Sequence, residues 1–417
     1  MRVLISTAGS HGDVLPFVAL ARKFASRGHE AIVYTNPFFR QYVEDAAIRF
    51  VPVGTVDQYA SLFGELADAN PIRAFRRVAA EFAALCPAYH RAMREDVVAG
   101  QTIVIGNSLL FAHRLLWETD QVPCATIHLA PSVVRSDDRP PRLTSASDWF
   151  GPRTPRILKK AAWWLLDKTF YDPEFTRPLN RNRAELGLPG VERIFRSWIH
   201  EANCVVGLFP DWFGQPQADW PANLALTGFP FYDHGDRQPL SRRLQDFIEA
   251  GPPPVAFSAG TATATAHGFF DVSVKAAQQA GVRAILLTHF AQQVPANLPQ
   301  NVIHVDYAPF GELLPRLAAF VHHGGIGSTS QALRAGVPQL VRPVAYDQFD
   351  NSARAVTLGV ARELLTQRYN PRAVADALTA ILGDQAMHER CRQIAERFGE
   401  GVDSIERTYN AICSRLA

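Results

Sequence analysis

The sequence has little of what marks membrane, secreted or nucleic-acid-binding proteins. No stretch of its 417 residues reaches the roughly 18 unbroken apolar residues of a membrane-spanning helix. The net charge is +2, and no run of lysine and arginine accompanies it, which argues against nucleic acid as a partner. No signal-peptide pattern precedes the first apolar run, so we expect a cytoplasmic protein.

Cysteine is scarce as well, and its spacing excludes two further classes. The five residues are scattered and form no CxxC pair: Cys86, Cys124, Cys204, Cys391 and Cys413. This pattern predicts reduced thiols, with neither a disulfide framework nor a zinc site.

The common nucleotide-binding motifs are also missing. The turn Gly9-Ser10-His11-Gly12 does not supply the GxGxxG spacing of a dinucleotide fold, and no GK[ST] ending is present. The second apolar run ends in Thr35-Asn36, where a dinucleotide fold needs an acidic residue. Both motif-defined nucleotide folds are therefore excluded.

What is present is a regular alternation of short apolar runs and amphipathic stretches, at 47% hydrophobic and 20% charged residues. This rhythm predicts an α/β protein with parallel sheets and helices on both faces. A helix is expected over 14–27, closed by Gly28. The expected strands are Val3–Ser6, Glu30–Thr35, Thr102–Ile105, Cys124–His128, Cys204–Leu208, Val255–Ser258, Ala284–Leu287, Val302–Val305, Ala319–His322 and Gln339–Arg342.

The length is too great for one ordinary core, so two doubly wound domains are predicted. The expected bounds are 1–227 for the first domain, 228–253 for a charged and proline-rich linker, and 254–395 for the second domain. Residues 396–417 are expected to form a helix that returns to the first domain, and Ser136–Arg156 to form a surface loop.

The richest stretch for chemistry is FVHHGGIGSTSQALRAGVPQL, residues 320–340. A strand ends in His322 and His323, then glycines lead into a helix that Ser328, Thr329 or Ser330 is expected to cap. Glycines let the backbone approach a ligand, and the helix N-terminus favours negative charge. The stretch predicts a phosphate site, and the alternative is a plain strand-to-helix turn.

A second stretch of the same kind follows the strand Val255–Ser258. Gly260 and Thr261 open a run of threonines and alanines that either reaches a phosphate from the other side or forms a polar loop. No paired acidic residues suggest a Mg²⁺ clamp, so backbone donors are expected to bind the anion without a metal or other cofactor.

Three segments together resemble the inverting GT-B glycosyltransferases of family one: GSHGDVLPF, HHGGIGSTSQALRAGVP and PVAYDQFDNSARAVTLGV. The likeness spans the whole chain. It implies the GT-B fold, with two Rossmann-like domains facing a central cleft. Further stretches, RIFRSWIH, LFPDWFGQPQADWP and LTGFPFYD, resemble one subgroup, the rhamnosyltransferase subunit of rhamnolipid synthesis.

The resemblance implies roles for individual residues of the second domain. His323, and His322 beside it, would contact the diphosphate of a nucleotide sugar, with donors from Gly325, Gly327, Ser328 and Thr329. Tyr307 and Phe310 fall in the segment that holds the nucleobase, where plant relatives carry tryptophan at the position of Tyr307. Asp347 and Gln348 match the pair that bonds the sugar hydroxyls.

In the first domain the resemblance implies that Asp13 is the general base that accepts the proton of the acceptor hydroxyl. The alternative from the residues alone is that Asp13 is the N-cap of a helix beginning at Val14. His11 is the rival base, and its alternative is a solvated loop histidine.

The acceptor is indicated only by apolar and aromatic residues. In residues 154–175 four basic residues lie among apolar ones, which predicts either a helix that touches a membrane or one packed on the acceptor cleft. Trp164 and Phe213, with Gly12 and His11, are the expected acceptor contacts. Peripheral contact with the inner face of the membrane and association with an acceptor-synthesising protein are further expectations.

The resemblance implies a metal-independent, inverting hexosyltransferase. The main hypothesis is transfer of L-rhamnose from dTDP-L-rhamnose to a 3-(3-hydroxyalkanoyloxy)alkanoate. The alternatives are transfer from a UDP- or dTDP-sugar to a polyketide, sterol or other secondary metabolite, a GT-B sugar-nucleotide epimerase, and a non-catalytic activator subunit.

Overall fold

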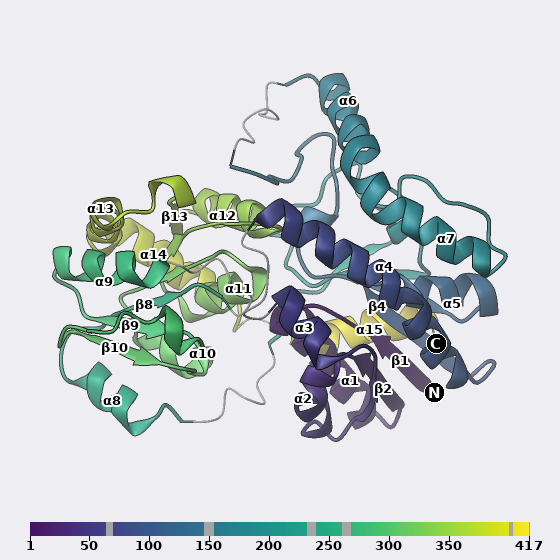
Figure 1. Ribbon diagram of the computed structural model, residues 1–417, viewed down its shortest axis with the longest axis horizontal. Helices are drawn as coiled ribbons and strands as arrows, with labels where there is room; N and C mark the ends of the chain where they lie inside the picture. The colour runs from purple at the N-terminus through teal and green to yellow at the C-terminus, as the bar shows by residue number, and fades with distance from the viewer. Residues whose placement is uncertain (64–69, 146–153, 232–238, 261–267, 400–402, 417) are drawn as a thin grey trace. The chain divides into compact units, whose positions relative to one another are not determined.

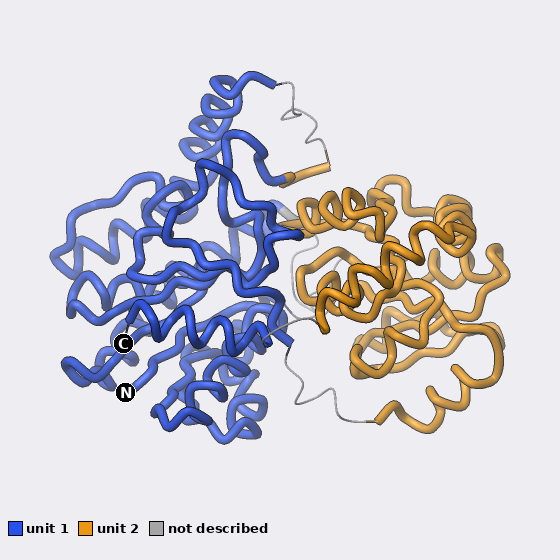
Figure 2. Tube along the Cα trace, turned by 180° about the vertical axis from the view of Figure 1, so that it is seen from behind, with its two compact units in different colours: residues 1–141, 146–231, 402–417 blue, residues 142–145, 232–401 orange. Residues whose placement is uncertain are grey.

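In the computed structural model the chain forms two compact units (Figures 1 and 2). Unit 1 comprises residues 1–141, 146–231 and 402–417, and unit 2 comprises 142–145 and 232–401. The structure describes residues 1–63, 70–145, 154–231, 239–260, 268–399 and 403–416.

Unit 1 is built on a seven-stranded parallel sheet in the order β3-β2-β1-β4-β5-β6-β7. Its strands are β1 Arg2–Ser6, β2 Glu30–Thr35, β3 Arg49–Pro52, β4 Thr102–Asn107, β5 Cys124–His128, β6 Cys204–Gly207 and β7 Leu224–Leu226. Its helices are α1 His11–Ser26, α2 Arg40–Glu44, α3 Val56–Phe63, α4 Pro71–Glu95, α5 Ala112–Asp120, α6 Arg156–Leu166, α7 Arg177–Glu185 and α15 Ser404–Leu416.

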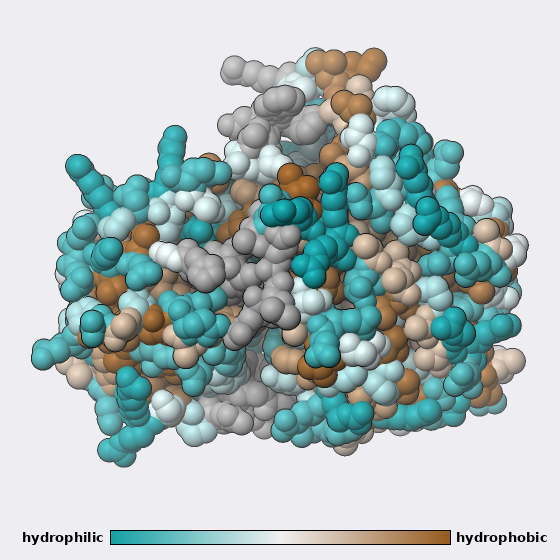
Figure 3. Space-filling model, viewed as in Figure 1, coloured by the Kyte–Doolittle hydropathy of each residue, from teal (hydrophilic) through white to brown (hydrophobic). Residues whose placement is uncertain are grey.

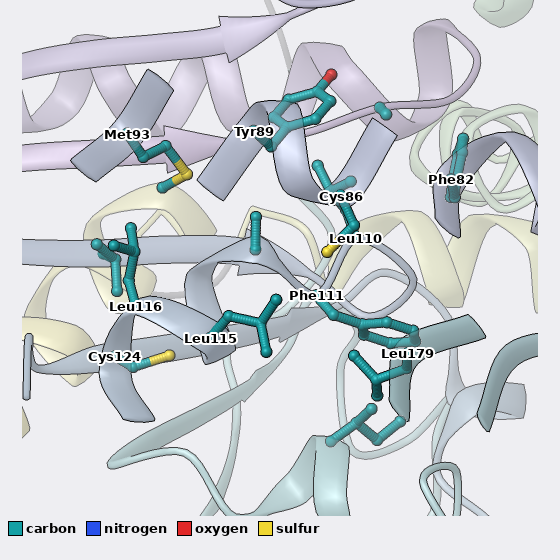
Figure 4. Close-up of a cluster of buried hydrophobic side chains, with 14 of the residues drawn as sticks. Phe82, Cys86, Tyr89, Met93, Leu110, Phe111, Leu115, Leu116, Cys124 and Leu179 are labelled. Atoms are coloured by element: carbon teal, nitrogen blue, oxygen red, sulfur yellow. The ribbon is translucent and has the colours of Figure 1, made fainter. Parts of the chain in front are cut away.

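Buried apolar side chains hold the helices on both faces of this sheet. On one face α4, α5 and α7 meet in a core that includes Met93, Leu115 and Leu179 (Figure 4). On the other face α15 packs against α1, where Glu406 forms ion pairs with Lys23 and Arg27. The last helix of the chain is thus part of unit 1.

Unit 2 repeats the plan with a six-stranded parallel sheet in the order β10-β9-β8-β11-β12-β13. Its strands are β8 Val255–Ser258, β9 Ala284–Leu287, β10 Val302–Val305, β11 Ala319–His322, β12 Gln339–Val341 and β13 Ala361–Glu363. Its helices are α8 Arg242–Glu249, α9 Phe269–Gln279, α10 Phe310–Leu313, α11 Ile326–Ala335, α12 Gln348–Thr357, α13 Pro371–Leu382 and α14 Gln385–Glu396.

The helices of unit 2 divide between the two faces of its sheet. Helices α9 and α13 pack against each other, and α13 also contacts β11 and β12. Helix α11 packs with α10, α12 and α14 over the opposite face, around a core that contains Phe320 and Leu313. The predicted α/β class with two doubly wound parallel sheets is confirmed.

Two expectations about loops are wrong in part. The segment 136–156 does not lie wholly on the surface, because Ser136 and Asp137 are buried and Asp137 accepts two hydrogen bonds from Arg196, at 2.8 and 2.7 Å. The segment 228–253 contains α8, whose apolar face joins the core of unit 2 through Leu244 and Ile248. Among the described residues no helix is both long and apolar enough to cross a bilayer.

Candidate active site

The turn after β11 carries the candidate anion site of unit 2. Helix α11 begins at Ile326 with Gly325 as its N-cap, and no side chain caps it. The first N–H groups of a helix have no partner inside the helix, and the helix dipole makes this end positive. Gly327 is exposed and Ser328 is half-buried, so both stand where a bound anion would meet the backbone.

His323 is fixed between two glycines at this turn. A Cβ atom on Gly260 would lie 2.7 Å from the imidazole, and one on Gly325 would lie 2.5 Å from its Nε2 atom. Glycine is therefore required at both positions for the ring to fit. Burial lowers the pKa of His323 to about 4, so the ring is neutral near pH 7. Within the described part of the chain its Nδ1 atom has no hydrogen-bond partner.

His322, in contrast to His323, has no ring nitrogen left for a ligand. Its Nδ1 atom accepts a hydrogen bond from the Gly324 N–H at 3.1 Å, and its Nε2 atom lies 2.9 Å from Oε1 of Gln339. The ring is buried and both of its nitrogens are bonded inside the protein, so the expected diphosphate contact from His322 is corrected to a structural one. Thr329 is only 1% exposed, and its buried hydroxyl has no hydrogen-bond partner among the described residues.

The loop between β12 and α12 is the second candidate ligand loop of unit 2. The Gln348 side chain accepts hydrogen bonds from the N–H groups of Val344 (2.8 Å) and Ala345 (3.0 Å), which leaves its amide NH₂ as the group for a ligand. Asp347, the N-cap residue of α12, keeps its carboxylate half-buried. Gln348 therefore shapes the loop as well as offering a donor.

Asn351 connects the two loops, and the sequence analysis missed it. Its buried Nδ2 group donates to Oδ2 of Asp347 at 2.7 Å and to the carbonyl of Gly324 at 3.0 Å. One amide thus fixes the candidate sugar contact relative to the candidate diphosphate turn. The signal in the sequence was its position four residues after Asp347, one helical turn on the same face.

Of the two residues expected to hold the nucleobase, Tyr307 is exposed and Phe310 is packed in the core. Tyr307 is 54% exposed and lies nearly parallel to His289, with ring centroids 6.2 Å apart and an interplanar angle of 14°. Phe310 packs edge-on against Phe320 at 5.4 Å and supports the core of unit 2. Phe310 therefore supports the segment from the core, whereas Tyr307 is more than half exposed. Thr261 lies outside the described residues.

In unit 1, Asp13 belongs to the first turn of α1. The N-cap of this helix is Ser10, so the expectation that Asp13 caps a helix beginning at Val14 is wrong. Asp13 is instead the third helical residue, and its Oδ2 atom accepts hydrogen bonds from the N–H and the hydroxyl of Ser10, each at 2.8 Å. A Cβ atom on Gly9 would lie 2.5 Å from the same oxygen, which requires glycine there.

The electrostatics of Asp13 favour a proton acceptor. Burial raises the pKa of its carboxyl group, and the two Ser10 hydrogen bonds offset only part of that rise. Among the described residues no group donates a hydrogen bond to its Oδ1 atom, and the residue is partly exposed. Asp13 therefore combines a structural role at the helix start with one carboxylate oxygen that no described residue bonds.

His11 lies in an aromatic cluster beside Asp13. Its ring meets Phe38, Phe39 and Tyr42 edge-on, with centroids 5.2 to 5.5 Å away, and Nε2 lies 3.2 Å from the Tyr42 hydroxyl. The expectation of a solvated loop histidine is therefore wrong. Tyr59 stacks on Phe38 at 4.1 Å, and its pKa is raised by burial and by the nearby charge of Asp13.

The remaining expected acceptor contacts differ in accessibility. Gly12 is exposed in the first turn of α1. Trp164 is 59% exposed on α6, in an apolar patch with Ile157, Leu158 and Leu165 that is visible at the top of Figure 3. Phe213 is only 2% exposed and packs on Phe229 at 5.1 Å, so its assignment to the acceptor site is corrected to the core.

Comparison with known proteins identifies relatives of both units. Residues 3–136 match the model of the glycosyltransferase family 28 N-terminal domain, and residues 277–400 match the erythromycin biosynthesis protein CIII-like C-terminal domain. The chain is 29% identical over 405 residues to the O-mycaminosyltylonolide 6-deoxyallosyltransferase of Streptomyces fradiae, covering 95% of this chain and 93% of that protein. It is 28% identical over 398 residues to the vancomycin aglycone glucosyltransferase of Amycolatopsis orientalis, covering 92% and 89%.

Solved structures show the same fold. The glycosyltransferase of kitacinnamycin superposes with a TM-score of 0.76 at 21% identity and covers 100% of this chain and 99% of its own. VinC in complex with dTDP has a TM-score of 0.68 at 20% identity, with 99% of both chains covered. Two doubly wound units of this kind define the GT-B fold. The family matches add the activity, and the chain is therefore a glycosyltransferase with the GT-B fold.

Proposed function

We propose that the protein transfers a sugar from a nucleoside-diphosphate donor to a hydroxyl group of a secondary metabolite of the macrolide or glycopeptide kind. The observation that carries this proposal is the uncapped N-terminus of α11 beside His323. A helix N-terminus and a neutral imidazole both donate hydrogen bonds to an anion, as a leaving diphosphate requires.

The residues of unit 2 that bind the nucleotide sugar contact different parts of it. His323 and the first N–H groups of α11 bind the diphosphate, while Asp347 and the amide of Gln348 bond the sugar hydroxyls. Tyr307 offers its exposed ring to the nucleobase. The dTDP bound to VinC, a structural neighbour, supports a thymidine nucleotide as the first donor to test.

Asp13 is the general base of the proposed reaction. Its free oxygen accepts the proton of the acceptor hydroxyl while the hydroxyl oxygen forms a bond to the anomeric carbon. The bond from that carbon to the diphosphate oxygen breaks at the same step, and the nucleoside diphosphate leaves with the electron pair. Attack opposite the leaving group inverts the anomeric configuration. General-base assistance of this kind contributes roughly 10²–10⁴-fold in rate.

The acceptor class is supported by the relatives and by the surface near Asp13. The two relatives act, by name, on O-mycaminosyltylonolide and on vancomycin aglycone, which favours the secondary-metabolite alternative over a rhamnolipid precursor. In the aromatic cluster of His11, Phe38, Tyr42 and Tyr59, the rings of Phe38 and Tyr42 are exposed, and the apolar surface of an aglycone packs against them.

A lipid-like acceptor remains a second candidate because of one observation. Four large apolar residues of α6 are exposed, and an alkanoyl chain or a membrane surface would cover such a patch. Under this reading dTDP-L-rhamnose and a 3-(3-hydroxyalkanoyloxy)alkanoate are the substrates.

A substrate panel tests both candidates. Purified protein is incubated with dTDP- and UDP-sugars and with macrolide aglycones, glycopeptide aglycones and hydroxyalkanoyl lipids, and products are identified by mass. Transfer to an aglycone with release of nucleoside diphosphate is the expected result. Turnover of the lipid alone would replace the acceptor class, and no transfer to any acceptor would refute the proposal.

A further inference from the structure

Arg342 is a buried cation for which the described chain provides no anion. The residue is 9% exposed, its Nε atom is buried without a hydrogen-bond partner, and no ion pair joins it to any described residue. Two other buried arginines are paired: Arg135 with Asp167 at 2.5 Å and Arg183 with Glu118 at 2.7 Å. An unpaired buried charge destabilises a fold. Arg342 is therefore a candidate to bind an anionic ligand.

Its position places it beside the candidate diphosphate site. Strands β11 and β12 are parallel, with His322 paired to Val341, and the Arg342 N–H continues the ladder to the His322 carbonyl at 2.8 Å. Arg342 is therefore the neighbour of His323 at the carboxyl edge of the sheet, where α/β proteins bind their ligands.

The surroundings of Arg342 are electropositive or neutral. Its guanidinium lies over the rings of Phe269 and Tyr369, at 5.5 and 5.1 Å from their centroids. Phe269 is the first residue of α9, and Tyr369 stands two residues before α13 begins, so two helix N-termini flank the cation.

We propose that Arg342 binds the diphosphate of the donor and supplies the positive charge of that site. This inference rests on the proposed function. His323 is neutral and offers only a single N–H group, whereas guanidinium keeps its charge and presents several donors in a fixed plane. As the bond to the sugar breaks, charge grows on the leaving diphosphate, and a fixed cation in a partly dry site stabilises it.

Binding of dTDP and of thymidine to the full chain, measured by calorimetry, tests the role of Arg342. We expect Arg342→Gln to weaken dTDP binding by about tenfold or more, to leave thymidine binding unchanged and to flatten the salt dependence of dTDP binding. Arg342→Lys should recover part of the loss. Because the cation is unpaired, the Gln variant should keep a melting temperature at or above that of the wild type.

Arg283→Gln is the matched control. Arg283 also stacks on an aromatic ring, that of Phe247 at 4.3 Å, but it precedes β9 and so lies at the opposite, amino end of the sheet. Its substitution should leave dTDP binding unchanged. Equal dTDP affinity in the wild type and Arg342→Gln would overturn this inference but not the proposed function. A loss of thymidine binding as large as the loss of dTDP binding would do the same. Absence of dTDP and UDP binding by the wild type would overturn the proposed donor site with it.

Discussion

Replacement of Asp13 by asparagine separates the catalytic from the structural role of this residue. The amide is nearly isosteric and can still accept hydrogen bonds from the N–H and hydroxyl of Ser10, so the start of α1 is kept. The amide cannot accept the proton of an acceptor hydroxyl. We therefore expect the transfer rate to fall by roughly 10²–10⁴-fold, or about 3–5 kcal/mol of barrier.

The raised pKa of Asp13 also predicts the direction in which this substitution changes the stability of the fold. Because its pKa is raised in the folded state, the group favours folding below its unfolded pKa and loses that contribution as pH rises through the folded pKa. Above the folded pKa the ionised, desolvated carboxylate therefore opposes folding. Asp13→Asn should melt at or above the wild-type temperature at pH 7 to 8, although it is nearly inactive.

The assay is a single-turnover measurement of product by mass, together with thermal melts of the same samples. The wild-type rate should fall on the acid side at a pH above that of an ordinary aspartate, whose pKa is near 3.8, and the Asn variant should lack this limb. Asp13→Ala is the structural control, since it loses the bonds to Ser10 and should cost roughly 1 kcal/mol of stability. Near wild-type turnover by Asp13→Asn would refute the assignment of the base.

Three further predictions concern the loops and the aromatic cluster. Asn351→Asp replaces an amide that donates hydrogen bonds to two oxygens by a carboxylate that can only accept them. The KM for the nucleotide sugar should rise about tenfold, with less effect on dTDP binding. Ser352→Ala, beside it on α12, should change neither quantity. Gly260→Ala should displace His323 and weaken dTDP binding by about tenfold, as measured by calorimetry; Gly28→Ala has a similar positive φ and an open surrounding, and should keep affinity. Tyr59→Leu removes a stacking ring and should raise the acceptor KM while the donor KM is unchanged, and a reversed pattern would contradict the placement of the acceptor.

Periodicity and turn chemistry were sufficient to predict the two parallel sheets. The central strands β1, β4, β8 and β11 are short apolar runs, and these are the segments that sequence reasoning identifies best. The edge strands β3, β7 and β13 were missed. Each has only three or four residues and is at most partly buried along most of its length, so its pattern is too weak to separate from a loop.

The site residues were predicted less completely, because a motif names neighbours in sequence and not the direction of their side chains. His322 and His323 are adjacent, yet one is bonded to Gln339 in the core and the other faces Gly260. Asn351 lies inside a recognised segment that gives it no role, and Arg342 lies just outside that segment. Their importance arises from one shared amide and from strand register. Only the packed structure shows which of these groups lacks a partner.

The anomeric configuration of the product tests the central claim most directly. A single displacement, with Asp13 as base and the diphosphate leaving from the opposite side of the sugar, requires inversion. Proton NMR of the glycoside formed from a donor of known configuration should therefore show the opposite configuration at the anomeric carbon. Retention of the donor configuration would contradict the mechanism, whichever acceptor the enzyme uses.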